Sequence, residues 1–198
     1  MKLYVEGLDP SLSNTGIVIC EIDIETGTIL DVPHMHLAET KTGGGGKKVR
    51  KNSDDLRRAR EIVEAEQVAR VMFKPKLVCV EVPQGTQSAR GALSNGVCIG
   101  ILGGINLPMI EVSPTEVKLA SAGTKTADKE DIVRWALERF PNAKWLTSSH
   151  KNEWEITHNG KYITKANEHL ADAIAAVAAA VKTEQFRGML AMLKAVQS

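Results

Sequence analysis

The chain opens on the stretch Leu3-Tyr4-Val5-Glu6-Gly7-Leu8-Asp9, an apolar strand-like run that ends on a carboxylate. A second run, Leu77-Val78-Cys79-Val80-Glu81, ends in the same way. A carboxylate in such surroundings costs several kcal/mol unless it is paired or bound to a metal ion. Neither run contains a Lys or Arg, although Lys2 directly precedes the first. The pattern therefore predicts a divalent cation as the partner, and hence a metal-dependent enzyme.

The segments around the first run predict a β-meander. Residues 3–8 and 15–22 are apolar and β-branched, and the Pro, Ser and Asn residues between them are typical of a turn. A third strand at about 30–38 follows the turn Glu25-Thr26-Gly27. The first forty residues are thus expected to form three antiparallel strands.

Two later strands complete a five-stranded mixed sheet inside an α/β sandwich. The strand at 77–82 is apolar on both faces, as expected where helices cover a sheet on each side. The fifth strand is expected at 108–112. The small residues of 88–103 indicate a helix packed close to a neighbour. Periodicity, caps and proline stops predict further helices. One is expected at 53–73 with Ser53 as its cap, and one begins at the capping-type start 113–116. The others are expected at 128–140, 167–182 and 184–196.

Residues 1–198 are expected to form one domain that carries two additions. Asn159-Gly160 lies between alternating runs, and both positions of a type I′ turn need a positive φ, so an inserted β-hairpin is predicted at about 153–164. The other addition is a basic, Gly-rich loop at about 41–52.

Composition narrows the class of protein. With 198 residues and 43% hydrophobic content, the chain can bury one sizeable core. It has no uncharged apolar run of about 18 residues and no pattern of a secretion signal, so a soluble, cytoplasmic protein is expected. Cys20, Cys79 and Cys98 lie far apart in apolar segments, which predicts reduced core thiols.

The charges are unevenly distributed although the net charge is only +1. Between Lys41 and Arg60, eight Lys or Arg stand against Asp54 and Asp55. Such an excess is typical of a surface that binds phosphates, and the alternative is a solvated loop and helix face.

Four potential ligands are expected to converge at one edge of the sheet. Asp9 and Glu81 each end a strand, and His169 and Asp172 are spaced i, i+3 on one helix face. Oxygen ligands with one imidazole suit Mg²⁺ or Mn²⁺, and an Asp shared by two ions would serve two-metal phosphodiester hydrolysis. Taken singly, Asp9 could cap a turn and Glu81 could be a paired buried acid, but four coincident positions favour a metal site.

This pattern resembles the RuvC family of Holliday-junction resolvases, within the ribonuclease H-like fold. The resemblance covers most of the chain. Its four motifs are similar to Gly7-Leu8-Asp9-Pro10-Ser11-Leu12-Ser13-Asn14-Thr15-Gly16, Val80-Glu81-Val82-Pro83, Ser113-Pro114-Thr115-Glu116-Val117-Lys118 with Gly123 and Lys129, and Glu168-His169-Leu170-Ala171-Asp172-Ala173-Ile174-Ala175.

The resemblance implies a homodimeric endonuclease that resolves four-way DNA junctions by paired symmetric nicks, with two Mg²⁺ or Mn²⁺ ions per active site. Asp9, Glu81 and Asp172 would be the carboxylate ligands, and His169 falls where the family carries Asp or His. Glu168 is a possible substitute ligand. The small-residue segment 88–104 and the helix before it are the expected dimer interface. The residues expected to hold DNA phosphates are Lys47, Lys48, Arg50, Lys51, Lys118, Lys125 and Lys129.

Two departures from the family indicate a divergent, phage-type member. Gln84-Gly85-Thr86-Gln87 stands where the family often has an aromatic wedge, and the Asn159-Gly160 hairpin has no known bacterial counterpart. Three alternatives remain open: a less selective branched-DNA or flap nuclease, a non-catalytic junction-binding protein, and an actin-like or sugar-kinase-like ATPase. The last needs two such lobes, which 198 residues cannot easily hold.

Overall fold

The computed structural model describes residues 2–43 and 50–197, and its centre is a five-stranded mixed sheet in the order β3-β2-β1-β4-β5. The prediction of this sheet is confirmed. The antiparallel half consists of β1 (Lys2–Asp9), β2 (Asn14–Asp23) and β3 (Ile29–Glu39). The parallel half adds β4 (Val78–Glu81) and β5 (Met109–Val112) to β1.

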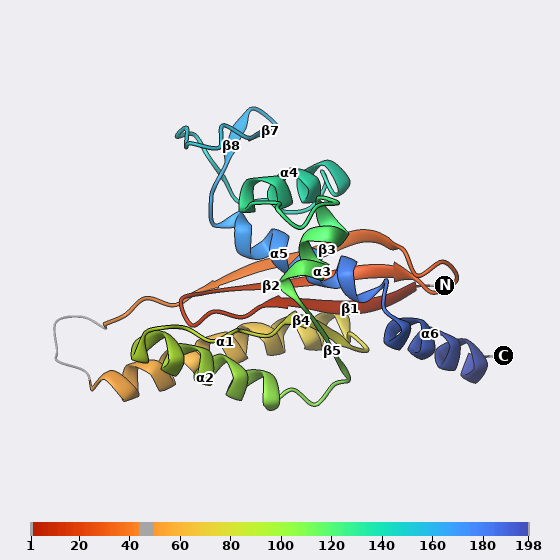
Figure 1. Cartoon of the computed structure of the whole chain (residues 1–198), viewed down its shortest axis with the longest axis horizontal. Helices are drawn as coiled ribbons and strands as arrows, with labels where there is room; N and C mark the ends of the chain where they lie inside the picture. Colours follow the sequence, from red (N-terminus) through yellow and green to blue (C-terminus); the bar gives the residue numbers. More distant parts are fainter. Residues whose placement is uncertain (1, 44–49, 198) are drawn as a thin grey trace.

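Helices cover both faces of the sheet (Figure 1). One face packs against α1 (Lys51–Phe73) and α2 (Ala89–Gly103). The other packs against α3 (Pro114–Ser121), α4 (Lys129–Arg139), α5 (Asn167–Ala180) and α6 (Glu184–Gln197). Strand alternation separates the two cores, because neighbouring side chains of one strand point to opposite faces. On β2, for example, Ile17 and Ile19 belong to the first core and Val18 and Cys20 to the second.

The helix starts agree only partly with the sequence. A capping box at Ser113 begins α3 as the sequence indicated, and α4 begins near its expected start with a capping box at Asp128 that was not predicted. The expected cap at Ser53 is wrong: α1 begins at Lys51, Arg50 is its N-cap residue, and no side chain caps it. Ser53 lies inside the first turn, where its backbone N–H already donates to the Arg50 carbonyl.

The expected close packing of the small-residue helix is not found along most of α2. Among the described residues, no atom lies within 4 Å of a Cβ placed on Gly96, Gly100 or Gly103. Gly91 is the crowded glycine, and its neighbours are Thr86 and Ser88 at the start of the same helix. These open glycines leave α2 with an uncovered outer face.

The inserted segment forms a second, three-stranded sheet, which projects beyond α4 in Figure 1. The predicted hairpin is confirmed: Asn159 (φ 49°) and Gly160 (φ 75°) connect β7 (Thr157–His158) to β8 (Lys161–Ile163). The additional strand is β6 (Thr147–Ser148), which pairs with β8. Two residues are too few for a periodic signal, so the sequence could not reveal β6.

Other features agree with the composition. Cys20, Cys79 and Cys98 are buried free thiols. Within the described ranges, the chain has no helix long and apolar enough to cross a membrane.

Candidate functional site

The strand pairing brings Asp9 and Glu81 to the same edge of the sheet. β1 and β4 run parallel, with Leu8 opposite Val80, and each carboxylate is the next residue along its strand. Asp9 and Glu81 are both half-buried. The first two turns of α5 supply His169 and Asp172 to this edge, as the sequence indicated. Together these four residues form the acidic site.

Two glycines let α5 lie directly against the strands. A Cβ atom on Gly16 of β2 would lie 2.2 Å from the His169 carbonyl oxygen, and one on Gly7 of β1 would lie 2.3 Å from the Ala173 carbonyl oxygen. Real Cβ atoms essentially never approach backbone so closely. The missing side chains therefore determine how near His169 comes to Asp9.

His169 lies between two carboxylates. Its Nδ1 is 2.6 Å from Asp9 Oδ2, and its Nε2 is 3.7 Å from Glu168 Oε1. Burial alone lowers the pKa of His169, but the hydrogen bond with Asp9 and the charges of Asp9 and Glu168 outweigh it, and the net pKa is raised. The imidazolium form is thereby favoured, and it neutralises part of the acidic site.

Asp172 and Glu81 both have raised pKa values. Burial raises the pKa of Asp172 to about 6, although its ion pair with Lys129 acts in the opposite direction. Burial, and then repulsion by Asp172 and Asp9, also raise the pKa of Glu81. These carboxylates require positive charge, because ionised groups out of water are costly without it.

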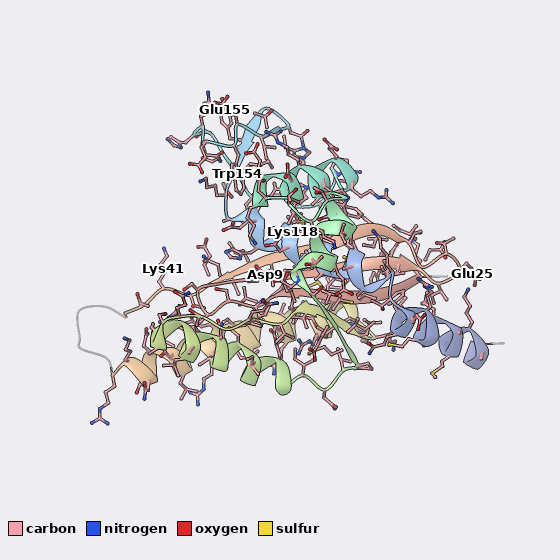
Figure 2. The ribbon with its side chains drawn as sticks, viewed as in Figure 1. Asp9, Glu25, Lys41, Lys118, Trp154 and Glu155 are labelled. Carbon is pink, nitrogen blue, oxygen red and sulfur yellow. The ribbon has the colours of Figure 1, made fainter. Side chains whose placement is uncertain are left out.

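A cavity of about 340 Å³ opens beside these acids between α3, α4 and α5. Its polar lining includes Glu81, Asp172, Lys118 and Lys129. Figure 2 labels Asp9 at its strand end and Lys118 on α3. Acids and lysines thus meet in one solvent-accessible hollow, an arrangement suited to an anionic substrate whose charge is balanced by cations.

The donor chemistry of the acidic site fits a hard divalent cation. Three carboxylates and one imidazole are ligands that Mg²⁺ or Mn²⁺ accepts. The site is not closed around an ion: across residues 2–43 and 50–197, no three His, Cys, Asp or Glu side chains are grouped to hold one. Asp9 is hydrogen-bonded to His169, and Asp172 forms an ion pair with Lys129. A metal ion would therefore replace these internal partners.

No protein-family model matches the chain. Two curated relatives from Synechococcus strains RCC307 and WH7803, both named crossover junction endodeoxyribonuclease RuvC, are 28% and 25% identical to it over 134 residues. The match covers 66% of this chain and 79% of each relative. The chain is a relative of the RuvC resolvases.

The fold of this RuvC relative is that of solved resolvases. Thermus thermophilus RuvC in complex with a Holliday junction substrate superposes with a TM-score of 0.61 at 19% identity, over 94% of this chain and 96% of that one. The yeast mitochondrial Holliday junction resolvase Ydc2 gives 0.58 at 10% identity, over 96% and 83%. The expected ribonuclease H-like fold is confirmed.

The RuvC relative also has a support for Asp9 that the sequence did not suggest. The Thr15 hydroxyl, which is buried, donates to the Ser11 carbonyl at 2.6 Å and closes the loop after Asp9. Arg58, only 2% exposed, donates to the Leu12 carbonyl at 3.0 Å and to Ser13 Oγ at 2.9 Å. An arginine inside a basic run indicates a solvated face, so its burial had no local signal.

The predicted phosphate-binding residues of this RuvC relative divide into groups. Lys47 and Lys48 lie outside the described residues. Arg50, Lys51 and Lys125 are exposed. Lys118 and Lys129 line the cavity, and Lys129 is paired with Asp172.

Some basic side chains between Lys41 and Arg60 are paired or buried, which the composition of this run did not predict. Arg57 forms ion pairs with Asp54 at 2.7 Å and Glu61 at 2.5 Å, and Arg58 is buried. The charge of Arg57 is thus balanced by two neighbouring acids, and Arg58 does not add to an exposed basic surface.

Proposed function

We propose that this protein is a structure-specific endonuclease, acting in the cytoplasm as one nuclease domain, that resolves four-way DNA junctions by hydrolysing phosphodiester bonds. The observation that carries the proposal is the convergence of Asp9, Glu81, His169 and Asp172 at one edge of a resolvase fold. A protein that only bound DNA would gain nothing from buried acids facing phosphate.

The acidic site is proposed to hold two Mg²⁺ or Mn²⁺ ions through Asp9, Glu81, Asp172 and His169. When bound, such ions lower the pKa of an attacking water and stabilise the leaving oxygen. The raised pKa values of Glu81 and Asp172 support this assignment, because both carboxylates are short of positive charge. Glu168, whose Oε1 lies 3.7 Å from His169 Nε2, adds negative charge beside the ring and would be the substitute ligand.

Lysines around the cavity would position the DNA backbone. Lys118 lines the same cavity as Glu81 and lies close enough to lower its pKa. Lys129, released from Asp172, would be free to contact a phosphate. Together with Lys125, Arg50, Lys51 and the lysines at 47 and 48, these cations would make junction binding steeply dependent on salt.

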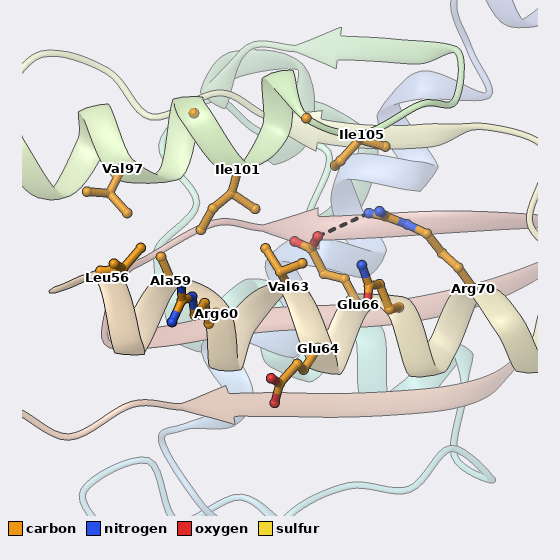
Figure 3. Close-up of a pocket in the computed structure, with 13 residues that line it drawn as sticks. Leu56, Ala59, Arg60, Val63, Glu64, Glu66, Arg70, Val97, Ile101 and Ile105 are labelled. Carbon is orange, nitrogen blue, oxygen red and sulfur yellow. Dashed lines mark hydrogen bonds and ion pairs between the residues drawn. The ribbon is translucent and has the colours of Figure 1, made fainter. Parts of the chain in front are cut away.

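Two symmetric nicks need two active sites, and a homodimer with two-fold symmetry supplies them. We place the interface on α1 and α2. A groove of about 590 Å³ lies between these helices, and Figure 3 shows Leu56, Val63, Val97 and Ile101 along it. The uncovered outer face of α2 and the exposed apolar side chains of α1 would be buried by a second copy.

The composition of the loop after β4 supports a second candidate function. Residues 84–87, which stand where the family often has an aromatic wedge, are exposed and small or polar. Without an aromatic wedge, selectivity for four-way junctions would be looser, and flaps and three-way branches would also be cut.

The test compares cleavage of four-way, three-way, flap and linear DNA with Mg²⁺ or Mn²⁺. We expect paired nicks in the four-way junction, and Asp9→Asn should abolish cleavage while folding and junction binding are retained. Equal cutting of flaps would favour the second candidate. Junctions that are bound but never cut with any divalent ion would contradict the nuclease assignment.

A further inference from the structure

The three-stranded insertion is attached directly to the helix that carries His169 and Asp172. Ile163 ends β8, and α5 begins at Asn167, two residues before His169. The insertion packs firmly on the main core through buried Ile156, Ile163 and Trp145. A shift of the insertion would therefore also shift the first turn of α5.

Asn167 makes this connection with its side-chain amide. The residue is fully buried, and its Nδ2 donates to the Leu146 carbonyl at 2.7 Å and to the Thr164 carbonyl at 2.8 Å. Its Oδ1 accepts from the Leu146 backbone N–H at 3.0 Å, and Thr164 Oγ1 lies 3.1 Å from Nδ2. One side chain thus joins the segment that enters the insertion to the segment that leaves it.

The first turn of α5 has one further side-chain bond, from His169 to Asp9 within the acidic site itself. Its N-cap residue is Ala166, in a helical conformation, and no side chain caps the helix. A polar cap ordinarily fixes the first turn of a helix and satisfies its free N–H groups. Here Asn167 instead joins that turn to Leu146 and Thr164, which lie outside the helix.

We propose that Asn167 is a positioning residue, which holds the first turn of α5 so that the His169 imidazole faces Asp9. The inference rests on the proposed function but concerns a residue outside the acidic site. The Asn167 side chain does not contact His169, and it acts through the backbone that the two residues share. Residues that orient metal ligands commonly affect metal affinity by roughly 10- to 100-fold.

The test is Asn167→Ala, with Asn152→Ala as the matched control. Asn152 also joins parts of the insertion, donating to the Ile163 carbonyl at 2.6 Å and accepting from the Trp154 N–H at 3.0 Å, but it does not bond α5 or the residues just before it. Two readouts are measured: the NMR chemical shifts of the His169 imidazole without metal, and the Mg²⁺ concentration that gives half-maximal junction cleavage.

For Asn167→Ala we expect shifted His169 resonances and a roughly tenfold higher half-maximal Mg²⁺ concentration, with metal-free junction affinity unchanged. Asn152→Ala should leave both readouts at the wild-type values. If Asn167→Ala does not fold, Thr164→Val removes one bond to the amide and should move both readouts in the same direction by a smaller amount.

Unchanged His169 resonances, or equal shifts in the control, would overturn the proposal. The NMR readout is independent of cleavage, so an inactive wild-type protein would contradict the proposed function and leave this test intact.

Discussion

At the residue scale, the site depends as much on absent side chains as on charged ones. Asp9 and His169 meet because Gly16 leaves room for the α5 backbone over β2. Adding one methyl group at Gly16 would push the His169 carbonyl, and with it the first turn of α5, away from the sheet. The acidic site should therefore be sensitive to volume at a position with no chemistry of its own.

Gly16→Ala is expected to lower the free energy of unfolding by about 1–3 kcal/mol, as overpacking of a core does, and to reduce cleavage strongly. Urea denaturation and junction cleavage measure the two effects. The control is Gly188→Ala on α6, where no described atom lies within 4 Å of the new Cβ. That exchange should stabilise the helix by up to about 1 kcal/mol. Equal behaviour of the two variants would contradict the volume argument.

At the scale of the element, α1 is fixed to its neighbours by one buried charge network. Asp55 accepts two hydrogen bonds from Arg90 of α2, both at 2.5 Å, and lies 3.7 Å from the buried Arg58. Arg58 in turn holds the loop after Asp9 and donates to Thr40 Oγ1 at 2.9 Å. The start of α1 thus connects α2, β3 and the loop beside the acidic site.

Asp55→Ala should cost about 3 kcal/mol or more of stability, because it leaves the buried Arg58 without its counter-charge. The matched control is Glu130→Ala, which breaks an exposed pair with Arg134 one helical turn away on α4. Exposed pairs of this kind contribute only about 0.3–0.5 kcal/mol. Denaturant unfolding compares the two variants, and similar losses would show that the network contributes little.

Most elements of this fold could be predicted, and the long-range pairs could not. Apolar runs ending on Asp9 and Glu81 reveal strands and candidate ligands because both signals are local. The ion pair between Lys129 and Asp172 spans 43 residues, and the burial of Arg58 follows from packing of α1 on a distant loop. Such contacts follow from tertiary packing, for which a single sequence has no periodic signal.

At the scale of the whole molecule, charge is also buried outside the acidic site. Glu6 of β1 is fully buried and accepts from Arg70 Nε at 2.7 Å, while Glu66 lies 3.2 Å from the same guanidinium. Within the described chain, Glu6 Oε1 has no hydrogen-bond partner. Two acids thus share one arginine, and burial raises the pKa of Glu66 from 4.5 to about 7.

This arrangement predicts that stability falls as pH rises. Between pH 4.5 and about 7 the folded chain holds a proton on Glu66 that the unfolded chain has lost, so the stabilisation is present below 4.5 and lost through 7. Glu66→Gln should remove this contribution, on the order of 3 kcal/mol. Thermal unfolding from pH 4 to 8 measures it, with the exposed Glu64→Gln as the control that keeps the wild-type slope. A wild-type slope in Glu66→Gln would contradict the prediction.

Two charge substitutions at exposed apolar residues test the proposed homodimer. Val71 on α1 is 77% exposed and Met192 on α6 is 72% exposed, so a charge at either site should be tolerated by the fold. Val71→Glu is expected to weaken the dimer at least tenfold, and Met192→Glu should leave it unchanged. Sedimentation velocity measures both, and a wild-type monomer at micromolar concentration with junction present would contradict the assignment.

The close packing of α5 on β1 and β2 has a consequence for how distant relatives can be recognised. Eleven consecutive buried residues, 170–180, are limited to Leu, Ile, Val, Ala and one Asp, because the strands beneath leave little space. A profile of permitted side-chain size along β1, β2 and α5 would describe this architecture even in a protein that had exchanged every residue of the acidic site. Searching by volume should therefore detect inactive descendants that a search by charged motifs would miss.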